Sequence, residues 1–234
     1  MGPPANRACL QTDKFSLVSD VWNKFVQNSI ACYKPGANIT VNEQLFPTKA
    51  WCWFTQYVSS KPDKSGIKSW LAADVDSKYM LNGFPYLGKD ESRPPGQRLG
   101  ENVVMRLMEP FLGKGRNVTM DNFFTSVSLA KKLVSNSMVG IINKNRRELP
   151  PSAQQQGELF TTSVLKHERV ILTVYRCKPR KNICLLSTLH PTVAINNDAK
   201  RKPETVTYYN ATKVGVEILD QMARLYSVKG GTCR

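Results

Sequence analysis

The order in which strand-like and helix-like segments follow one another restricts this 234-residue chain to an α/β fold. Apolar runs with the two-residue period of strands dominate the first part of the sequence, and amphipathic runs with the 3.6-residue period of helices come between later strands. The early strand-like runs lie at 38–44, 51–57, 67–74 and 79–87. The last three follow in close succession, which predicts an antiparallel meander.

Helices are predicted before, between and after the strands. They lie at 13–33, at 101–112, after an N-cap at Thr125 or Ser126, and at 213–226. Two further strands are predicted at 116–121, which ends on Asp121, and at 138–142. The order of three strands followed by helix, strand, helix and strand predicts an RNase H-like core, in which a mixed sheet is flanked by helices.

Polar loops alternate with strand-like runs in the segment that precedes the last helix, and this segment differs in character from the rest. We therefore expect the first part of an RNase H-like core at 1–145, a β-rich insertion at 146–206, and the final acidic helix of the core, cut short, at 207–234.

Lys and Arg outnumber Asp and Glu by 33 to 18, which gives a net charge of +15. Such a surface attracts polyanions, of which nucleic acid is the commonest, and double-stranded DNA is the expected partner. A solvated basic surface and an anionic membrane surface remain the alternatives. The basic residues expected on loops that reach phosphates are Lys144, Arg146, Arg147, Lys178, Arg180, Lys181, Lys200, Arg201 and Lys202. One of these clusters could equally act as a nuclear import signal.

Other classes of protein are disfavoured by the composition. No apolar run approaches a membrane span, and the first residues lack the apolar core of a signal peptide. The six cysteines include no short CxxC pair, so neither a zinc knuckle nor a dense disulfide framework is expected. These features predict an intracellular protein with no membrane partner and no small-molecule substrate. The cysteines are Cys9, Cys32, Cys52, Cys177, Cys184 and Cys233.

Three acidic residues occupy places suited to a metal site. Asp121 ends a strand, and Glu217 and Asp220 lie three apart on the last helix, so they project from nearly one face. Carboxylates gathered at one end of a sheet can hold Mg²⁺ ions, which activate the attacking oxygen and stabilise the leaving oxygen when DNA is cut. The alternative is that Asp121 begins an Asx turn and the other two form a solvated helix face.

Four blocks carry a resemblance to a known family: NITVNEQL at 38–45, KPDKSGIK at 61–68, NVTMDNFFTS at 117–126 and YYNATKVGVEILDQM at 208–222. They resemble, in order and over nearly the whole chain, the piggyBac transposases. The resemblance implies an RNase H-like catalytic domain that cuts DNA through a hairpin intermediate and rejoins it in the nucleus.

The catalytic positions that the resemblance implies are Asn42, Asp121, Glu217 and Asp220, with Mg²⁺ on the last three. The family has aspartate where Asn42 stands, and a neutral amide weakens a site that must offset the repulsion between two cations. Glu43 should point to the opposite face of its strand and should not replace the missing charge. Glu217 stands for a family aspartate with an arm one methylene longer, and Val214 replaces the first of two glycines before the helix.

The length also departs from the pattern of the family, in which further helices and a Cys-rich zinc-binding module follow the last catalytic acid. We therefore expect a fragment or a decayed copy, with a homodimer left open.

Three functions follow. The first is a piggyBac transposable element-derived, DNA-binding domain whose cleavage and strand transfer are lost or impaired. The second is an active Mg²⁺-dependent transposase or nuclease. The third is a non-catalytic interaction scaffold, in which the basic clusters would be dispersed over the surface. A separate expectation concerns the aromatic residues Trp51, Trp53, Phe54 and Tyr57, which should lie in the core rather than stack on bases.

Overall fold

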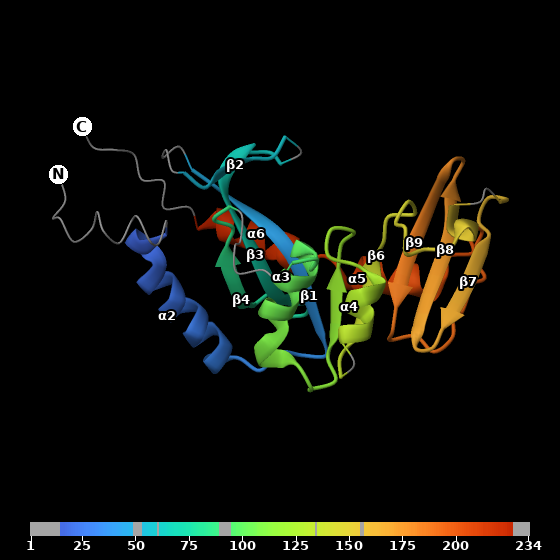
Figure 1. Ribbon diagram of the computed structural model, residues 1–234, viewed down its shortest axis with the longest axis horizontal. Helices are drawn as coiled ribbons and strands as arrows, with labels where there is room; N and C mark the ends of the chain where they lie inside the picture. The colour runs from blue at the N-terminus through green and yellow to red at the C-terminus, as the bar shows by residue number, and fades with distance from the viewer. Residues whose placement is uncertain are drawn as a thin grey trace.

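A single mixed sheet runs through the protein in the computed structural model, which describes residues 15–48, 53–59, 61–88, 95–133, 135–154 and 157–226. The strands of these residues follow the order β2-β3-β1-β5-β6-β9-β8-β7, and β4 pairs with β3 beside β2 (Figure 1). Four residues for which predictions were made lie outside the described residues: Trp51, Cys9, Cys52 and Cys233.

The first half of the sheet is antiparallel. β1 (Asn38–Pro47) pairs with β3 (Ser65–Asp74), whose other edge pairs with β2 (Thr55–Tyr57) and β4 (Met80–Pro85). The three predicted runs pair antiparallel, but the predicted meander is wrong, because β2 and β4 share one edge of β3 and β1 occupies its other edge. β2 is shorter than the predicted run.

The second half begins where β5 (Asn117–Met120) pairs in parallel with β1, and β6 (Ser137–Ile141) pairs in parallel with β5. This junction of antiparallel and parallel strands at β1 is the mixed sheet that the sequence predicts. Strands β1 and β5 run upward in Figure 1, so their carboxyl ends form the upper edge of the sheet.

The β-rich segment continues the same sheet. β9 (Lys181–Ser187) is antiparallel to β6, and β8 (Val170–Lys178) and β7 (Thr162–His167) follow outward. The sequence predicts β8 and β9 because most of β8 is buried and apolar and the second half of β9 is buried as well. β7 was not predicted, since nearly all its residues are exposed.

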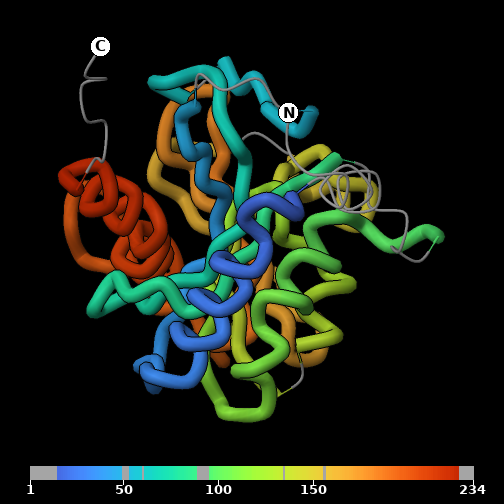
Figure 2. Tube along the Cα trace, turned by 90° about the vertical axis from the view of Figure 1, so that its left-hand side faces the viewer, coloured from blue at the N-terminus to red at the C-terminus, as the bar shows by residue number. Residues whose placement is uncertain are grey.

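Helices cover both faces of the sheet, as Figure 2 shows. One face carries α3 (Leu99–Met108), the 3₁₀ turn η1 (Glu109–Phe111) and α4 (Val127–Lys132). The other carries α5 (Glu204–Thr212) and α6 (Gly215–Leu225), while α2 (Ser16–Cys32) lies against β4. A second 3₁₀ turn, η2, spans Pro151–Gln154. None of the helices in the described ranges is both long and apolar enough to cross a bilayer.

The two faces of β1 differ in polarity. Ile39 and Val41 join the main apolar core beneath α3, which also includes Leu107 and Met120. The opposite face presents Thr40, Asn42 and Gln44 toward α5 and α6, where two apolar clusters smaller than the main core form. Alternation along one strand thus separates the core from a polar layer, and this layer contains the candidate site.

Candidate acidic site and nucleic-acid interface

The sheet brings Asn42 and Asp121 to the same edge. Val41 of β1 lies opposite Met120 of β5 in a parallel pair, so the next residue of each strand is Asn42 and Asp121. Two positions earlier, Thr40 Oγ1 donates to the carbonyl of Thr212 at 2.5 Å, and Thr119 Oγ1 donates to Thr212 Oγ1 at 2.8 Å. Because side chains two apart share a face, Asn42 and Asp121 both lie on the side of α5 and α6.

Asn42 uses its side-chain oxygen within its own strand. Its Oδ1 accepts a hydrogen bond from the backbone N–H of Glu43 at 2.8 Å. The amide is neutral, so position 42 of the candidate site supplies a carbonyl dipole instead of the negative charge of a carboxylate.

Glu43 points to the opposite face from Asn42, as predicted, and forms an ion pair with Lys68. The negative charge of Glu43 nevertheless affects the pKa of Asp121. Burial raises the pKa of Asp121 above its usual value and the charge of Glu43 adds to the effect, while backbone N–H groups of the following loop and the charge of Lys68 oppose it. The carboxylate of Asp121 is therefore only partly compensated, and a nearby cation would favour its ionised form.

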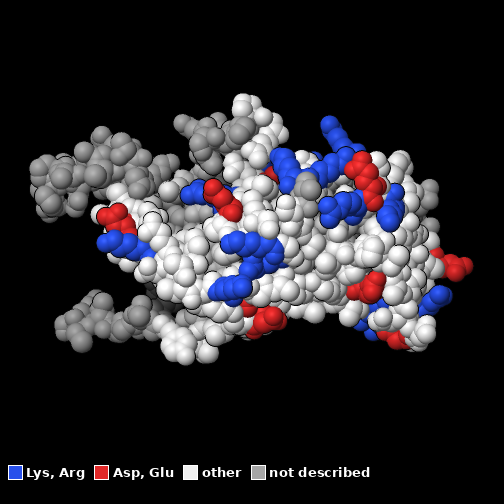
Figure 3. Space-filling view, turned by 90° about the horizontal axis from the view of Figure 1, so that it is seen from below, with Lys and Arg blue, Asp and Glu red and all other residues white. Residues whose placement is uncertain are grey.

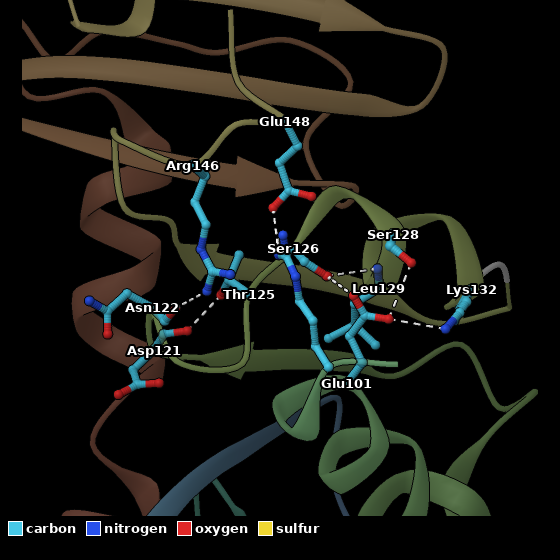
Figure 4. A network of polar contacts seen from close by, with 11 residues as sticks. Glu101, Asp121, Asn122, Thr125, Ser126, Ser128, Leu129, Lys132, Arg146 and Glu148 are labelled. Atoms are coloured by element: carbon cyan, nitrogen blue, oxygen red, sulfur yellow. Dashed lines mark hydrogen bonds and ion pairs between the residues drawn. The ribbon is translucent and has the colours of Figure 1, made fainter. Parts of the chain in front are cut away.

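Asp121 does begin an Asx turn, because its Oδ1 accepts the backbone N–H of Phe123 at 2.9 Å. The turn is held on its other side by Thr125, whose hydroxyl donates to the carbonyl of Asp121 at 2.7 Å. Figure 4 shows the Asp121 carboxylate on the opposite side of the residue from the carbonyl that Thr125 contacts. The Asx turn and the Thr125 hydroxyl together fix the backbone around Asp121.

A buried carboxylate that the sequence did not single out anchors this loop. Ser126 Oγ accepts the N–H of Leu129 as the N-cap of α4 and donates to Glu101 Oε1 at 2.7 Å. Glu101 also accepts from Ser128 and from Lys132, at 3.2 and 3.0 Å (Figure 4). Burial raises the pKa of Glu101, but these hydrogen bonds and the charge of Lys132 outweigh it, and the pKa is lowered.

Helix α6 approaches β1 closely because Gly215 lacks a side chain. A Cβ at this position would lie 2.9 Å from Thr40 Oγ1. The helix carries Glu217, which is exposed, and Asp220, which is partly buried. Burial raises the pKa of Tyr209, and the charges of Asp121 and Glu217 add to this shift, so both carboxylates act on one buried tyrosine.

Asp220 already has a cationic partner from its own helix. Its Oδ1 accepts hydrogen bonds from Gln44 Nε2 and from Arg224 Nε, the latter at 2.9 Å. Arg224 also bonds Asp63, in the turn between β2 and β3. Sequence reasoning missed Arg224, although its spacing of four from Asp220 is typical of a helical ion pair.

This donor set, as arranged, does not fit a pair of divalent cations. One corner is neutral at Asn42, and the charge of Asp220 is offset by Arg224. Within the described ranges, no three His, Cys, Asp or Glu side chains are grouped so as to hold a metal ion. The assignment of Asp121, Glu217 and Asp220 as metal ligands stays a prediction.

The first basic cluster, Lys144 to Arg147, touches the acidic site directly. It follows β6 at the carboxyl edge, and Arg146 Nη2 donates to the carbonyl of Asn122 at 2.9 Å (Figure 4). A guanidinium is thereby fixed one residue from Asp121.

The other two clusters extend the same edge. Leu185 of β9 pairs with Ile141 at the end of β6, so the earlier residues of β9 project beyond that end. Lys178 and Lys181 close the resulting β8–β9 hairpin, with Arg180 in its turn. The segment Lys200–Lys202 lies beside β8, because the Tyr175 hydroxyl donates to the carbonyl of Lys200 at 2.6 Å. Figure 3 shows the opposite, lower side, where Lys and Arg also occur but lie among Asp and Glu.

The expectation that the early aromatic residues belong to the core is correct for Phe54, which is 8% exposed. It is wrong for Trp53 and Tyr57, which are 83% and 69% exposed. Tyr57 is the last residue of the short edge strand β2, and Trp53 lies in the turn before that strand.

The comparisons with known proteins agree with this geometry. A family model described as Transposase IS4 matches residues 3–233. Among solved structures, the chain is similar to a cryo-EM structure of the piggyBac transposase synaptic complex with hairpin DNA, with 37% sequence identity and a TM-score of 0.89. The match covers 97% of this chain and 48% of that one, so this chain spans about half the length of the relative. The similarity confirms the predicted α/β core with its mixed sheet.

Proposed function

The chain belongs to the piggyBac-type transposase family, and we propose that it is a transposase-like DNA-binding domain in which cleavage and strand transfer are lost or strongly impaired. Transposases of the DDE type generally use a divalent metal ion, and the related piggyBac transposase is described in complex with hairpin DNA. Double-stranded DNA is accordingly the partner that we propose for this chain.

The observation that carries DNA binding is the position of the three basic clusters at the carboxyl edge of the sheet. Lys144 to Arg147 reach the Asp121 loop, and the β8–β9 hairpin with Lys200–Lys202 extends the edge. Cations along one edge can follow the phosphates of a duplex and release its counterions. The interaction-scaffold alternative requires dispersed clusters and is therefore less well supported.

The proposal of impaired cleavage is based on the low negative charge at the two positions near Asp121 that the family motifs mark, Asn42 and Asp220. Asn42 contributes no charge, and the carboxylate of Asp220 is shared with Arg224. Two divalent ions a few ångströms apart repel each other, and carboxylates must offset that repulsion.

The second candidate is an active Mg²⁺-dependent transposase or nuclease that uses Asp121, Glu217 and Asp220. The raised pKa of Asp121 favours it, since a carboxylate short of positive partners is suited to a cation. Nicking of supercoiled DNA in Mg²⁺ tests this candidate. We expect the wild type to show no more nicking than its Asp121→Ala variant, and nicking above that level would favour the active enzyme.

Fluorescence anisotropy with a labelled duplex at several KCl concentrations tests DNA binding. We expect the affinity to fall steeply with salt, and replacement of Lys178, Arg180 and Lys181 by Ala to reduce the slope of log K against log[KCl] by about 3, roughly 1 for each phosphate contact.

The matched control removes the same number of charges from the amino side of the sheet, at Lys34, Lys114 and Lys131, which are exposed. This variant should keep the wild-type slope. Equal losses in both triple variants, or binding that does not respond to salt, would contradict a DNA interface at the carboxyl edge.

We further propose that the protein acts in the nucleus, with Lys200–Lys202 as a candidate import signal, and that two copies join when DNA is bound. The relative is described as a synaptic complex, which supports the second point. Imaging of a fluorescent fusion with Arg201→Ala and Lys202→Ala tests the location, and light scattering with and without DNA tests dimerisation.

A further inference from the structure

Phe123, two residues after Asp121, presents an aromatic ring to solvent although buried rings hold it in place. It stacks on Trp70 with ring centres 5.3 Å apart and planes inclined by 14°, and it meets Phe124 edge-on at 5.0 Å. Trp70 and Phe124 are each 1% exposed, whereas Phe123 is 42% exposed. Phe123 is therefore held by core rings while much of its surface remains available to a ligand.

The backbone beneath this ring is also fixed. The N–H of Phe123 donates to Asp121 Oδ1. Its carbonyl lies so near the start of α3 that a Cβ on Gly100 would approach it to 2.7 Å. A ring that is already held in one orientation loses little conformational entropy when a ligand stacks on it.

The charges nearby indicate what such a ligand would be. Arg146 is held on the carbonyl of Asn122, between Asp121 and Phe123, and no other hydrogen bond of its guanidinium is seen within the described residues. Lys68 Nζ lies 4.3 Å from the centre of the Trp70 ring and 5.6 Å from that of Phe123. An exposed aromatic ring beside a guanidinium matches the base and phosphate of a nucleotide.

We propose that Phe123 stacks on one unpaired nucleobase of the bound DNA and that Arg146 binds the adjoining phosphate. The inference rests on the proposed DNA-binding function and makes it more specific. In a fully paired duplex the bases are stacked on one another and cannot reach the ring, so DNA with an extrahelical base should bind more tightly.

Two labelled DNAs test the proposal, a paired duplex and the same duplex with one unpaired thymine, each titrated by anisotropy at fixed salt. We expect the wild type to prefer the bulged DNA by about 5- to 150-fold, the equivalent of one stacked base. Phe123→Leu should lose this preference while keeping the affinity for paired duplex, and Phe123→Trp should retain it.

Tyr57→Leu is the matched control, because Tyr57 is an exposed aromatic residue on β2. It should leave the preference unchanged, and circular dichroism should show that all variants are folded. Arg146→Gln should weaken binding of the bulged DNA and reduce its salt slope by about 1.

A crosslink provides a direct readout. With 5-iodouracil at the unpaired position, irradiation should join the DNA to the tryptic peptide 117–131, which contains Phe123, and the Phe123→Leu variant should lose that product. Equal binding of the two DNAs by the wild type would overturn the proposal while duplex binding still stood. An equal loss of both affinities in Phe123→Leu would also overturn it. Failure to bind either DNA would refute the proposed function itself.

Discussion

The loop that follows β5 and the helix α6 both carry acidic residues to the carboxyl edge of the sheet, but different forces hold them. Asp121 sits on a loop fixed by backbone hydrogen bonds, by the Ser126 cap and by the buried Glu101. Asp220 is tied by side chains alone, to Gln44 and Arg224.

The difference supports the proposed loss of cleavage. The Asp121 loop keeps a rigid backbone and an only partly compensated carboxylate. At the corners formed by Asn42 and Asp220 the negative charge is missing or offset. We propose that a scaffold suited to contact DNA persists here without the charge needed for metal-dependent chemistry.

Removing the anchor of the loop should give the largest effect on stability. Glu101→Ala leaves the Ser126 hydroxyl and Lys132 without their acceptor, and we expect the free energy of unfolding to fall by about 2–3 kcal/mol. Denaturation in urea measures this value.

The matched change on α6 is Arg224→Ala, which removes ion pairs that are partly exposed and should cost about 1 kcal/mol or less. If Arg224→Ala proved as costly as Glu101→Ala, the contrast between the two regions would be wrong.

The pH dependence of stability should sharpen the same contrast. The folded pKa of Glu101 is lowered, so its contribution is present above the unfolded value of 4.5 and is lost as the pH falls through the folded pKa. Glu101→Gln should therefore be destabilised relative to wild type at neutral pH, and the gap should narrow below about pH 4.5. Thermal melts from pH 7 to pH 3 measure it, and a gap that stays constant would contradict the role of the charge.

A smaller effect of opposite sign is expected at Asp121. Its folded pKa is raised, so ionisation costs stability as the pH rises through that value. Asp121→Asn should raise the Tm at pH 7 in the absence of metal by roughly 2–4 °C, because it removes the cost of burying a charge. A lower Tm would show that the carboxylate is instead well compensated.

Much of the fold could be predicted from the sequence, because alternation of apolar residues marks a half-buried strand and the order of the elements marks the core. Helix α5 is not predicted from the sequence, in which the last predicted helix begins at 213. The buried face of α5 includes Thr205 and Thr212, which a hydrophobic period does not detect. The exposed strand β7 carried no such signal either.

Within the candidate site, only the residues that lie in the family motifs could be predicted from the sequence. The resemblance pointed to Asn42 and Asp121, and parallel pairing of β1 with β5 places them together. Contacts between residues far apart in the chain could not be predicted from the sequence. Glu101 meets Ser126 across 25 positions and Arg224 meets Asp63 across 161, so nothing in the local sequence links the partners.

The most direct test of the account is to restore a carboxylate at position 42 and to measure whether DNA cleavage appears. Supercoiled DNA with Mg²⁺ or Mn²⁺ would be incubated with the wild type, Asn42→Asp, and Asn42→Asp combined with Asp121→Ala. We predict metal-dependent nicking by Asn42→Asp alone, with the wild type and the double variant at background. Nicking by the wild type equal to that of Asn42→Asp, or none by either protein, would contradict the account.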